Sequence, residues 1–304
     1  MTVRVHSPMA AYKLEPLITR TPSQRVRRTR IAYASLTLLM PMVGALVAIA
    51  RAAQRGVGAV ELVSLSVMYF VTGLGITVGY HRGLSHRAFV AHPILDGVLL
   101  ALGAMAGQGP ALRWVADHRR HHEFSDQPGD PHSPRDGVWH AHVGWLFTSS
   151  MSNPLYYCRD AMRNPRARFV SQTYPHWIAA GIVLPGLVAY AMTRDVEALV
   201  SAMLWGGFIR LVLSSHASFA VNSIAHLLGN RSFATHDHSG NVAWLAIPTL
   251  GEAWHNNHHA NPTAAHFGLR KWQFDLGGYF ITVMAGIGLI TQVRSTDSVP
   301  KHSQ

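Results

Sequence analysis

The sequence predicts an all-α integral membrane protein, with four spanning helices in two hairpins and a cytoplasmic helical cap that carries clustered histidines. Three observations predict this class. Charged residues make up only 13% of the chain and apolar residues 48%, whereas a soluble domain carries about 25% charge. Four apolar stretches are long enough to cross a bilayer. Finally, the chain contains 20 histidines, most of them in short clusters.

Each hairpin is predicted from two apolar stretches and the short loop between them. About 20 apolar residues are enough to span the hydrocarbon core of a membrane. Arg210 interrupts the last stretch, so we expect that face of the helix to meet protein or a cavity rather than lipid. The four stretches are residues 31–50, 57–80, 177–192 and 198–219.

The remaining segments are too short or too polar to span a membrane. Residues 94–107 are apolar and rich in Gly and Ala, and we expect a re-entrant or interfacial helix there. Residues 277–290 are apolar but also short. Residues 110–175 are polar and rich in turn residues, which predicts an extramembrane region.

The distribution of Lys and Arg predicts the orientation. Seven lie in residues 1–30, and only three lie in the two hairpin loops. The positive-inside rule then places both termini and the histidine-rich segments in the cytoplasm. We expect a basic cytoplasmic N-terminal segment (1–30), one membrane domain (31–290) and a polar C-terminal tail (291–304). The net charge of +11 fits an anionic membrane surface better than nucleic acid.

Three histidine clusters suggest a metal site. The second, His118-Arg-Arg-His121-His122, and the third, His255-Asn-Asn-His258-His259, share one spacing, which places the rings on one helical face. In the first, His81-Arg-Gly-Leu-Ser-His86, a spacing of five puts the rings about 140° apart on an α-helix. We therefore expect that helix to end within the cluster, as Gly83 allows. Adjacent imidazoles lack hydrogen-bond partners when they are neutral and repel one another when they are protonated. Binding of a metal resolves both problems.

A fourth element, Asn222-Ser-Ile-Ala-His226, places Asn222 and His226 on one helical face. Alone, His226 and the first cluster are more typical of interfacial histidines, but the clusters together contain nine histidines. One metal takes about four to six ligands, so nine imidazoles predict two metals. Imidazole suits iron among other metals, and zinc sites seldom need so many nitrogens.

A carboxylate-type di-iron bundle is the main rival, and it needs Glu-x-x-His twice plus two further Glu residues. Only Glu252-Ala-Trp-His255 fits, so the rival fails on ligand count. We expect Glu252 to orient an imidazole through its ring N–H. Asp117, Glu123, Asp126 and Asp130 flank the second cluster and are either similar partners or solvated charges. We predict that the other histidines are not ligands: His6, His92, His176, His236, His238 and His302, and, as structural or supporting residues, His132, His140, His142, His216 and His266.

Several motifs around these clusters resemble the membrane fatty-acid desaturases, specifically the Δ9-type acyl desaturases. They cover roughly residues 31–290, and two departures from the family pattern are Gly83-Leu84 and Ser232 after Arg231. The matching segments are residues 75–81, 114–122, 130–132, 142–145, 222–226, 251–259 and 272–275.

The resemblance implies a set of ligands for two iron ions. It comprises nine histidines and, through a water molecule, Asn222. The histidines are His81, His86, His118, His121, His122, His226, His255, His258 and His259.

The implied reaction is the O₂-dependent introduction of a cis double bond, at Δ9, into a saturated acyl chain carried on CoA, carrier protein or phospholipid. No haem, Cys-x-x-Cys or nucleotide-binding motif is present. A separate ferredoxin, rubredoxin or cytochrome b5-like protein with its reductase is therefore expected to supply electrons. The expected location is the bacterial inner membrane.

Two other functions remain open. An acyl hydroxylase or acetylenase would use the same scaffold, although the spacing of five in the first cluster favours desaturation. A metal-binding or transport protein would need polar ligands near mid-bilayer, and these clusters lie at the cytoplasmic edge. Tyr69 lies about 18 Å before His81 on the same helix, where it could either form the floor of an acyl tunnel or pack against lipid or a neighbouring helix.

Overall fold

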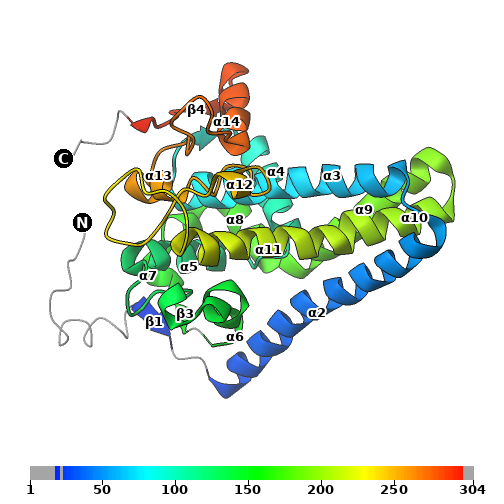
Figure 1. The fold of residues 1–304 in the computed structure, drawn as a ribbon, viewed down its shortest axis with the longest axis horizontal. Helices are drawn as coiled ribbons and strands as arrows, with labels where there is room; N and C mark the ends of the chain where they lie inside the picture. Colours follow the sequence, from blue (N-terminus) through cyan, green and yellow to red (C-terminus); the bar gives the residue numbers. More distant parts are fainter. Residues whose placement is uncertain (1–17, 21–22, 149, 297–304) are drawn as a thin grey trace.

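The fold is a long helical bundle with a cap at one end (Figure 1), seen in a computed structural model that describes residues 18–20, 23–148 and 150–296. Four of its helices are long and apolar enough to cross a membrane. The predicted all-α, four-span class is therefore confirmed. The four spans are α2 (Gln24–Arg55); α3 (Ala59–Leu74) continued by the π-helix η1 (Gly75–Ser85); α9 (Tyr174–Thr193); and α10 (Val196–Ala202) continued by the π-helix η5 (Met203–Ile209), α11 (Arg210–Ser223) and the short η6 (Ile224–His226).

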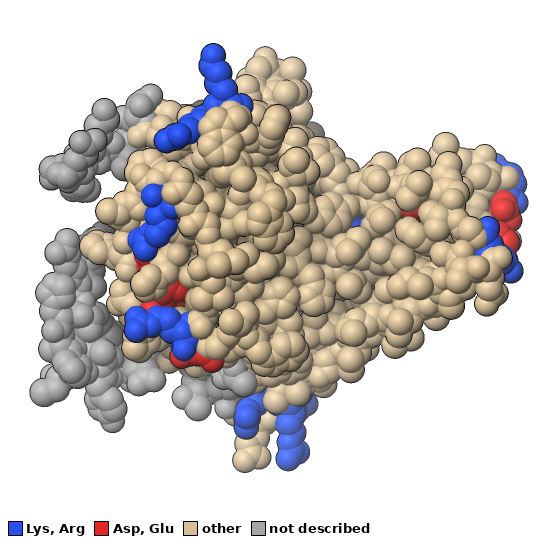
Figure 2. Space-filling view, in the orientation of Figure 1, with Lys and Arg blue, Asp and Glu red and all other residues tan. Residues whose placement is uncertain are grey.

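The spans form the two predicted hairpins, α2 with α3 and α9 with α10. At the tip of the bundle, Arg51 and Arg55 of the first hairpin both pair with Glu197 of the second. Helix α2 starts before the predicted residue 31, because the Ser23 side chain accepts a hydrogen bond from the Val26 N–H and caps it. On the face drawn in Figure 2, Lys and Arg gather at the cap and at the tip, and few lie between them.

The cap contains several helices and two small sheets. Strand β1 (Thr19–Arg20) pairs antiparallel with β3 (Met151–Ser152), and β2 (Val90–Ala91) pairs antiparallel with β4 (Ile290–Thr291). The apolar segment predicted as a re-entrant or interfacial helix forms α4 (Pro93–Met105), which packs along η1 and α9, and the short apolar stretch 277–290 forms most of α14 (Leu276–Gly286). The other cap helices are α5 (Ala111–Phe124), η2 (Pro134–Asp136), η3 (His140–Gly144), α6 (Trp145–Thr148), α7 (Pro154–Tyr157), η4 (Ala161–Arg163), α8 (Pro165–Gln172), α12 (Ala243–Ala246) and α13 (His255–Ala260).

The helix ends inside the first histidine cluster, at Ser85, as predicted, but its winding changes before it ends. The chain continues as the π-helix η1 as far as Ser85, and the His86 N–H donates to the His81 carbonyl at 3.1 Å. In this winding, residues five apart lie nearly one above the other. The two rings consequently face the same side, with centroids 5.0 Å apart. The change of helix type, which the sequence did not predict, brings His81 and His86 together.

The prediction for Arg210 is confirmed. Its side chain is completely buried and donates hydrogen bonds to three backbone carbonyls. Strand β1 lies within the predicted N-terminal segment and β4 reaches into the predicted tail. Of the histidines predicted not to be ligands, His6 and His302 lie outside the described residues.

Candidate metal centre

The nine predicted ligand histidines come together in two adjacent groups where the bundle meets the cap. Within each group, the ring nitrogens that could bind a metal lie within 4.8 Å of one another. We call them the five-histidine group and the four-histidine group. The first contains His81, His86, His118, His122 and His258, and the second contains His121, His226, His255 and His259.

Helices α5 and α13 each contribute to both groups. On α5, His118 and His122 lie one turn apart and join the five-histidine group, whereas His121 joins the other. Helix α13 has the reverse arrangement, since His258 joins the five-histidine group and its two neighbours in the cluster join the four-histidine group. The groups meet where the rings of His122 and His259 stack with centroids 4.5 Å apart.

Ring nitrogens point at one another inside each group. In the five-histidine group, the Nε2 atoms of His86 and His118 are 2.7 Å apart, and those of His258 and His122 are 2.9 Å apart. In the other group, the Nε2 atoms of His226 and His255 are 2.9 Å apart. Nε2 of His259 is buried without a hydrogen-bond partner among the described residues, as is Nδ1 of His255 and of His258. Converging lone pairs with an orphaned buried nitrogen are the donor set that a nitrogen-binding metal such as iron requires.

Carboxylates hold the far nitrogen of four of these rings. Nδ1 of His81 bonds to Glu252, as the sequence predicts for that glutamate. Nδ1 of His121 bonds to Asp130 at 3.0 Å, and Nδ1 of His226 bonds to Asp126 at 2.8 Å. Such a partner keeps the proton on Nδ1 and leaves Nε2 as the free donor.

Sequence reasoning missed a fourth carboxylate. Oδ2 of Asp237 lies 2.7 Å from Nδ1 of His259. The residue lies in an irregular loop between two non-ligand histidines, so no helical spacing links it to the cluster on α13. Two predicted candidates have other contacts: Asp117 accepts from Ser152 and pairs with Arg113, and Glu123 accepts weakly from Tyr156.

The electrostatics keep most of these imidazoles neutral. Burial lowers the pKa of five of them well below 6.5, and the charge of neighbouring imidazoles lowers it further; these are His86, His118, His122, His255 and His258. Burial also lowers the pKa of His259 to about 4, against the opposing effect of Asp237. For His121 burial acts in the same direction, but the charge and hydrogen bond of Asp130 outweigh it and the pKa is raised. Burial raises the pKa of Asp130 and Asp237, but the adjacent imidazoles outweigh it and leave both values below the ordinary one.

The other described histidines lie outside both groups. His132 is buried beside His121, with ring centroids 4.4 Å apart, and burial lowers its pKa to about 3. His142 and His216 contact each other through nitrogens 3.0 Å apart, and His266 bonds to Thr282. The described histidines predicted not to be ligands therefore lie in neither group, although His132 forms a third set of possible metal-binding residues with His121 and Asp130.

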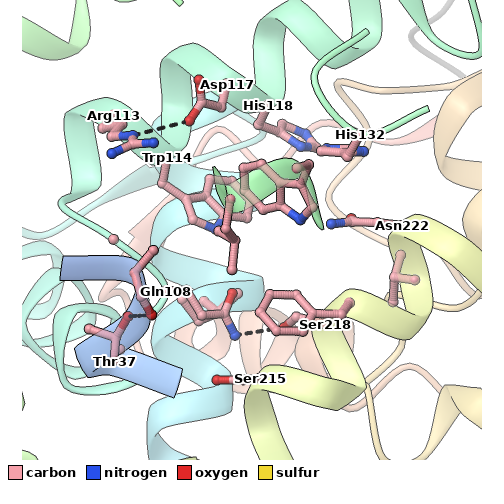
Figure 3. A pocket seen from close by; sticks show the side chains of 18 of the residues that line it. Thr37, Gln108, Arg113, Trp114, Asp117, His118, His132, Ser215, Ser218 and Asn222 are labelled. Atoms are coloured by element: carbon pink, nitrogen blue, oxygen red, sulfur yellow. Dashed lines mark hydrogen bonds and ion pairs between the residues drawn. The ribbon is translucent and has the colours of Figure 1, made fainter. Parts of the chain in front are cut away.

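A cavity runs past the imidazoles. Its wall includes His81, His118, His121 and His255, and the predicted Asn222 also lines it. In Figure 3, Gln108 and Ser218 face each other across the lower part of this cavity, and the Gln108 amide donates to the Ser218 hydroxyl at 2.6 Å. Trp114 stacks on His118, with ring centroids 4.9 Å apart.

A second, less polar cavity continues from the first. Gln108 and Ser218 line both cavities, as do Ile76, Val221 and Glu252, so these residues lie where the cavities meet. Tyr69 lines the second cavity, and its hydroxyl donates to the carbonyl of Pro248 at 2.6 Å. The combination of a nitrogen-rich site and two adjoining cavities suits an oxidation carried out on a long hydrocarbon chain.

A profile of the fatty acid desaturase family matches residues 57–277. The chain belongs to the fatty acid desaturase family. It is 38% identical over 268 residues to a hex-5-enoyl-[acyl-carrier protein] acetylenase of Moorena producens, covering 84% of each chain. It is 36% identical over 235 residues to the sn-1 stearoyl-lipid 9-desaturase of Anabaena variabilis, covering 76% of this chain and 83% of that protein.

A plant relative gives the same result. Over 238 residues the chain is 35% identical to Delta-9 acyl-lipid desaturase 1 of Arabidopsis thaliana, covering 78% of this chain and 75% of the relative. This desaturase is therefore an oxidoreductase of lipid metabolism, with apolar helices that could cross a membrane and histidine groups that could bind metal.

Proposed function

We propose that the protein uses O₂ to introduce a cis double bond, at Δ9, into a saturated acyl chain at a centre of two irons. The observation that carries this proposal is the cavity that is lined by residues of both imidazole groups and adjoins a second chamber. Net, one –CH₂–CH₂– unit, one O₂, two electrons and two protons give one –CH=CH– unit and two waters.

In this proposal each histidine group binds one iron, and Asn222 reaches the iron of the four-histidine group through water. Bound there, the irons would supply O₂ activation and the removal of hydrogen from an unactivated methylene. The protein's own residues do the rest. The carboxylates hold protons on the Nδ1 atoms, and the cavity wall orients the acyl chain and excludes water.

The carrier, orientation and electron source are parts of the same proposal. We propose that the cap and both termini lie in the cytoplasm of a bacterial inner membrane. The acyl chain would arrive as a CoA, carrier-protein or phospholipid ester, and a ferredoxin, rubredoxin or cytochrome b5-like protein would deliver the electrons. The exposed Arg and Lys side chains of the cap support docking of an acidic donor.

Tyr69 supports a preference for chain length. It lines the chamber beyond the Gln108–Ser218 pair, and its hydroxyl is tied to Pro248. We propose that its ring is the floor that limits the acyl tail. Tyr69→Ala should shift products toward longer chains, whereas Tyr69→Phe, which keeps the ring, should leave the profile unchanged. An identical chain-length profile for all three proteins would remove this role.

The second candidate is an acetylenase, which would act on a chain that already has a double bond. The similarity to the Moorena producens acetylenase favours it. Feeding an expressing host labelled saturated and monounsaturated acids in parallel separates the two functions. Acetylenic product from the unsaturated acid alone would establish the second.

The main test is expression in a host that lacks the product, followed by mass spectrometry that locates double bonds. We expect an O₂-dependent monounsaturated acid and about two irons per purified chain. Protein that contains no iron and makes no unsaturated product would overturn the proposal.

A further inference from the structure

Arg210 is a buried cation in the middle of a membrane-spanning helix that the proposed chemistry does not use. It lies about 24 Å along the helix from His226, and it does not line either cavity. Among the described residues no carboxylate pairs with it. A guanidinium in this position is costly, so its contacts should reveal why it is there.

Its three contacts are carbonyls, and two of them lack a backbone donor. Nη2 donates to Gly181 O at 2.9 Å. Four residues later in α9 stands Pro185, which has no N–H to offer that carbonyl. Nη1 donates to Met105 O at 2.7 Å, at the last residue of α4. The Gly109 N–H, which would reach Met105 O if the helix continued, bonds to the Tyr174 hydroxyl instead.

The third contact returns to the arginine's own helix. Nε donates to Gly206 O at 3.1 Å, inside the π-helix η5. One side chain thus joins α4, α9 and the α10–α11 span, and supplies donors where a proline and a helix end have removed them. Gly181 permits this close approach, since a Cβ there would lie 3.1 Å from Arg210 Nη2 and 2.9 Å from Met105 Cβ.

Two of the residues at the junction between the cavities, Gln108 and Ser218, lie on or next to elements that Arg210 joins, α4 and α11. Ser218 lies on α11, about two turns beyond Arg210. Gln108 follows the end of α4 by way of Gly107, which has a φ of +77°. A Cβ at Gly107 would lie 2.8 Å from Leu211, the residue after Arg210. The turn that carries Gln108 is therefore held directly against the part of α11 that Arg210 anchors.

We propose that Arg210 is a positioning residue that holds Gln108 in register with Ser218 and thereby sets where the acyl chain bends relative to the histidine groups. This inference rests on the proposed function, because it takes the two cavities as the acyl site. It assigns Arg210 a role in choosing the carbon atoms that are oxidised, although the side chain touches neither substrate nor metal.

The first experiment measures the position of the double bond. Arg210→Met keeps the length of the side chain but removes every donor. A displacement of about 1 Å can lower a rate about 100-fold, so we expect the share of minor positional isomers to rise roughly tenfold, with a greater change in kcat than in KM. The single nitrogen of Arg210→Lys cannot reach three separated carbonyls. Its share of minor isomers should therefore lie between those of the wild type and Arg210→Met. Arg51→Met, at the bundle tip, should leave the isomers unchanged.

The second experiment measures thermal stability and does not need activity. Pro185→Ala restores a backbone N–H for Gly181 O. In the Arg210→Met background it should raise Tm by more than it does in the wild type, and Pro41→Ala in α2 should show no such coupling. If Arg210→Met folds too poorly to study, Arg210→Lys carries the same comparison.

Unchanged isomer ratios together with additive Tm values would overturn the role of Arg210. Wild-type protein that makes no unsaturated product would instead overturn the proposed function, and the Tm comparison would still test the carbonyl contacts.

Discussion

The two imidazole groups lie side by side but are supported differently. In the part of the chain that the structure describes, three of the four rings in the four-histidine group bond to a carboxylate, from Asp130, Asp126 or Asp237. In the five-histidine group only His81 does, through Glu252. A carboxylate fixes the tautomer and makes the ring a stronger donor. If each group binds one iron as proposed, one would rely on strengthened donors and the other on an additional donor.

Loss of a ligand gives the largest expected effect and tests whether the groups are separate sites. We expect His258→Ala and His255→Ala each to reduce iron from two per chain toward one, because each removes a nitrogen from one group only. Activity should fall more than about 100-fold, beyond the cost of losing a supporting residue. Metal analysis of the folded protein checks this, and loss of both irons in either variant would contradict two separate sites.

Removal of a supporting carboxylate should act on one group at a time. Asp237→Asn should lower the affinity of the four-histidine group for iron by about 10–100-fold, and Glu252→Gln should lower that of the five-histidine group by the same factor. Competition with a chelator measures both affinities. Asp117→Asn is the matched control, because Asp117 bonds to Ser152 and Arg113 rather than to a ring. Equal weakening in the control would remove the distinction.

Acid should destabilise the iron-free protein mainly through the five-histidine group. Burial lowers the pKa of four of its members, so the unfolded chain binds more protons than the folded one below about pH 6.5. The contribution of these rings to the free energy of unfolding is fully present above that pH. Below it, the contribution falls by up to about 1.4 kcal/mol per pH unit for each ring. These members are His86, His118, His122 and His258.

His121 in the other group has the opposite sign. Its pKa is raised, so the stability that it contributes is complete below about pH 6.5 and is lost as the pH rises through the folded value. Melting curves of iron-free protein from about pH 7.5 to 5 test this difference. His122→Gln should flatten the dependence of Tm on pH, and His121→Gln should steepen it. The same slope in both variants would refute the opposite signs of the two contributions.

Asn222 gives the smallest expected effect. If it contacts iron through water, Asn222→Ala should keep two irons per chain and lower activity about tenfold, the value of one hydrogen bond. Ser215 lines the same cavity (Figure 3), so Ser215→Ala is a suitable control. Activity equal to that of the control would leave Asn222 without this role.

The sequence alone determined the features that depend on local spacing. Apolar stretches of membrane length predict the four spans, because backbone groups in lipid must be bonded within a helix. The repeated spacing of three and four on α5 and α13 predicts a metal site, and the nine clustered histidines together predict two metals. A charge inside the last span predicts that Arg210 faces protein or a cavity rather than lipid. Each of these patterns is complete within a few helical turns.

Only the tertiary structure decided how the parts meet. It divided each three-histidine cluster between the two groups, wound the first cluster as a π-helix, and brought Asp237 to His259 from a loop without periodicity. It also placed Gln108 against Ser218 across 110 positions of chain. The physical reason is that spacing specifies which face of an element a side chain occupies, whereas the packing of distant elements decides what that face meets.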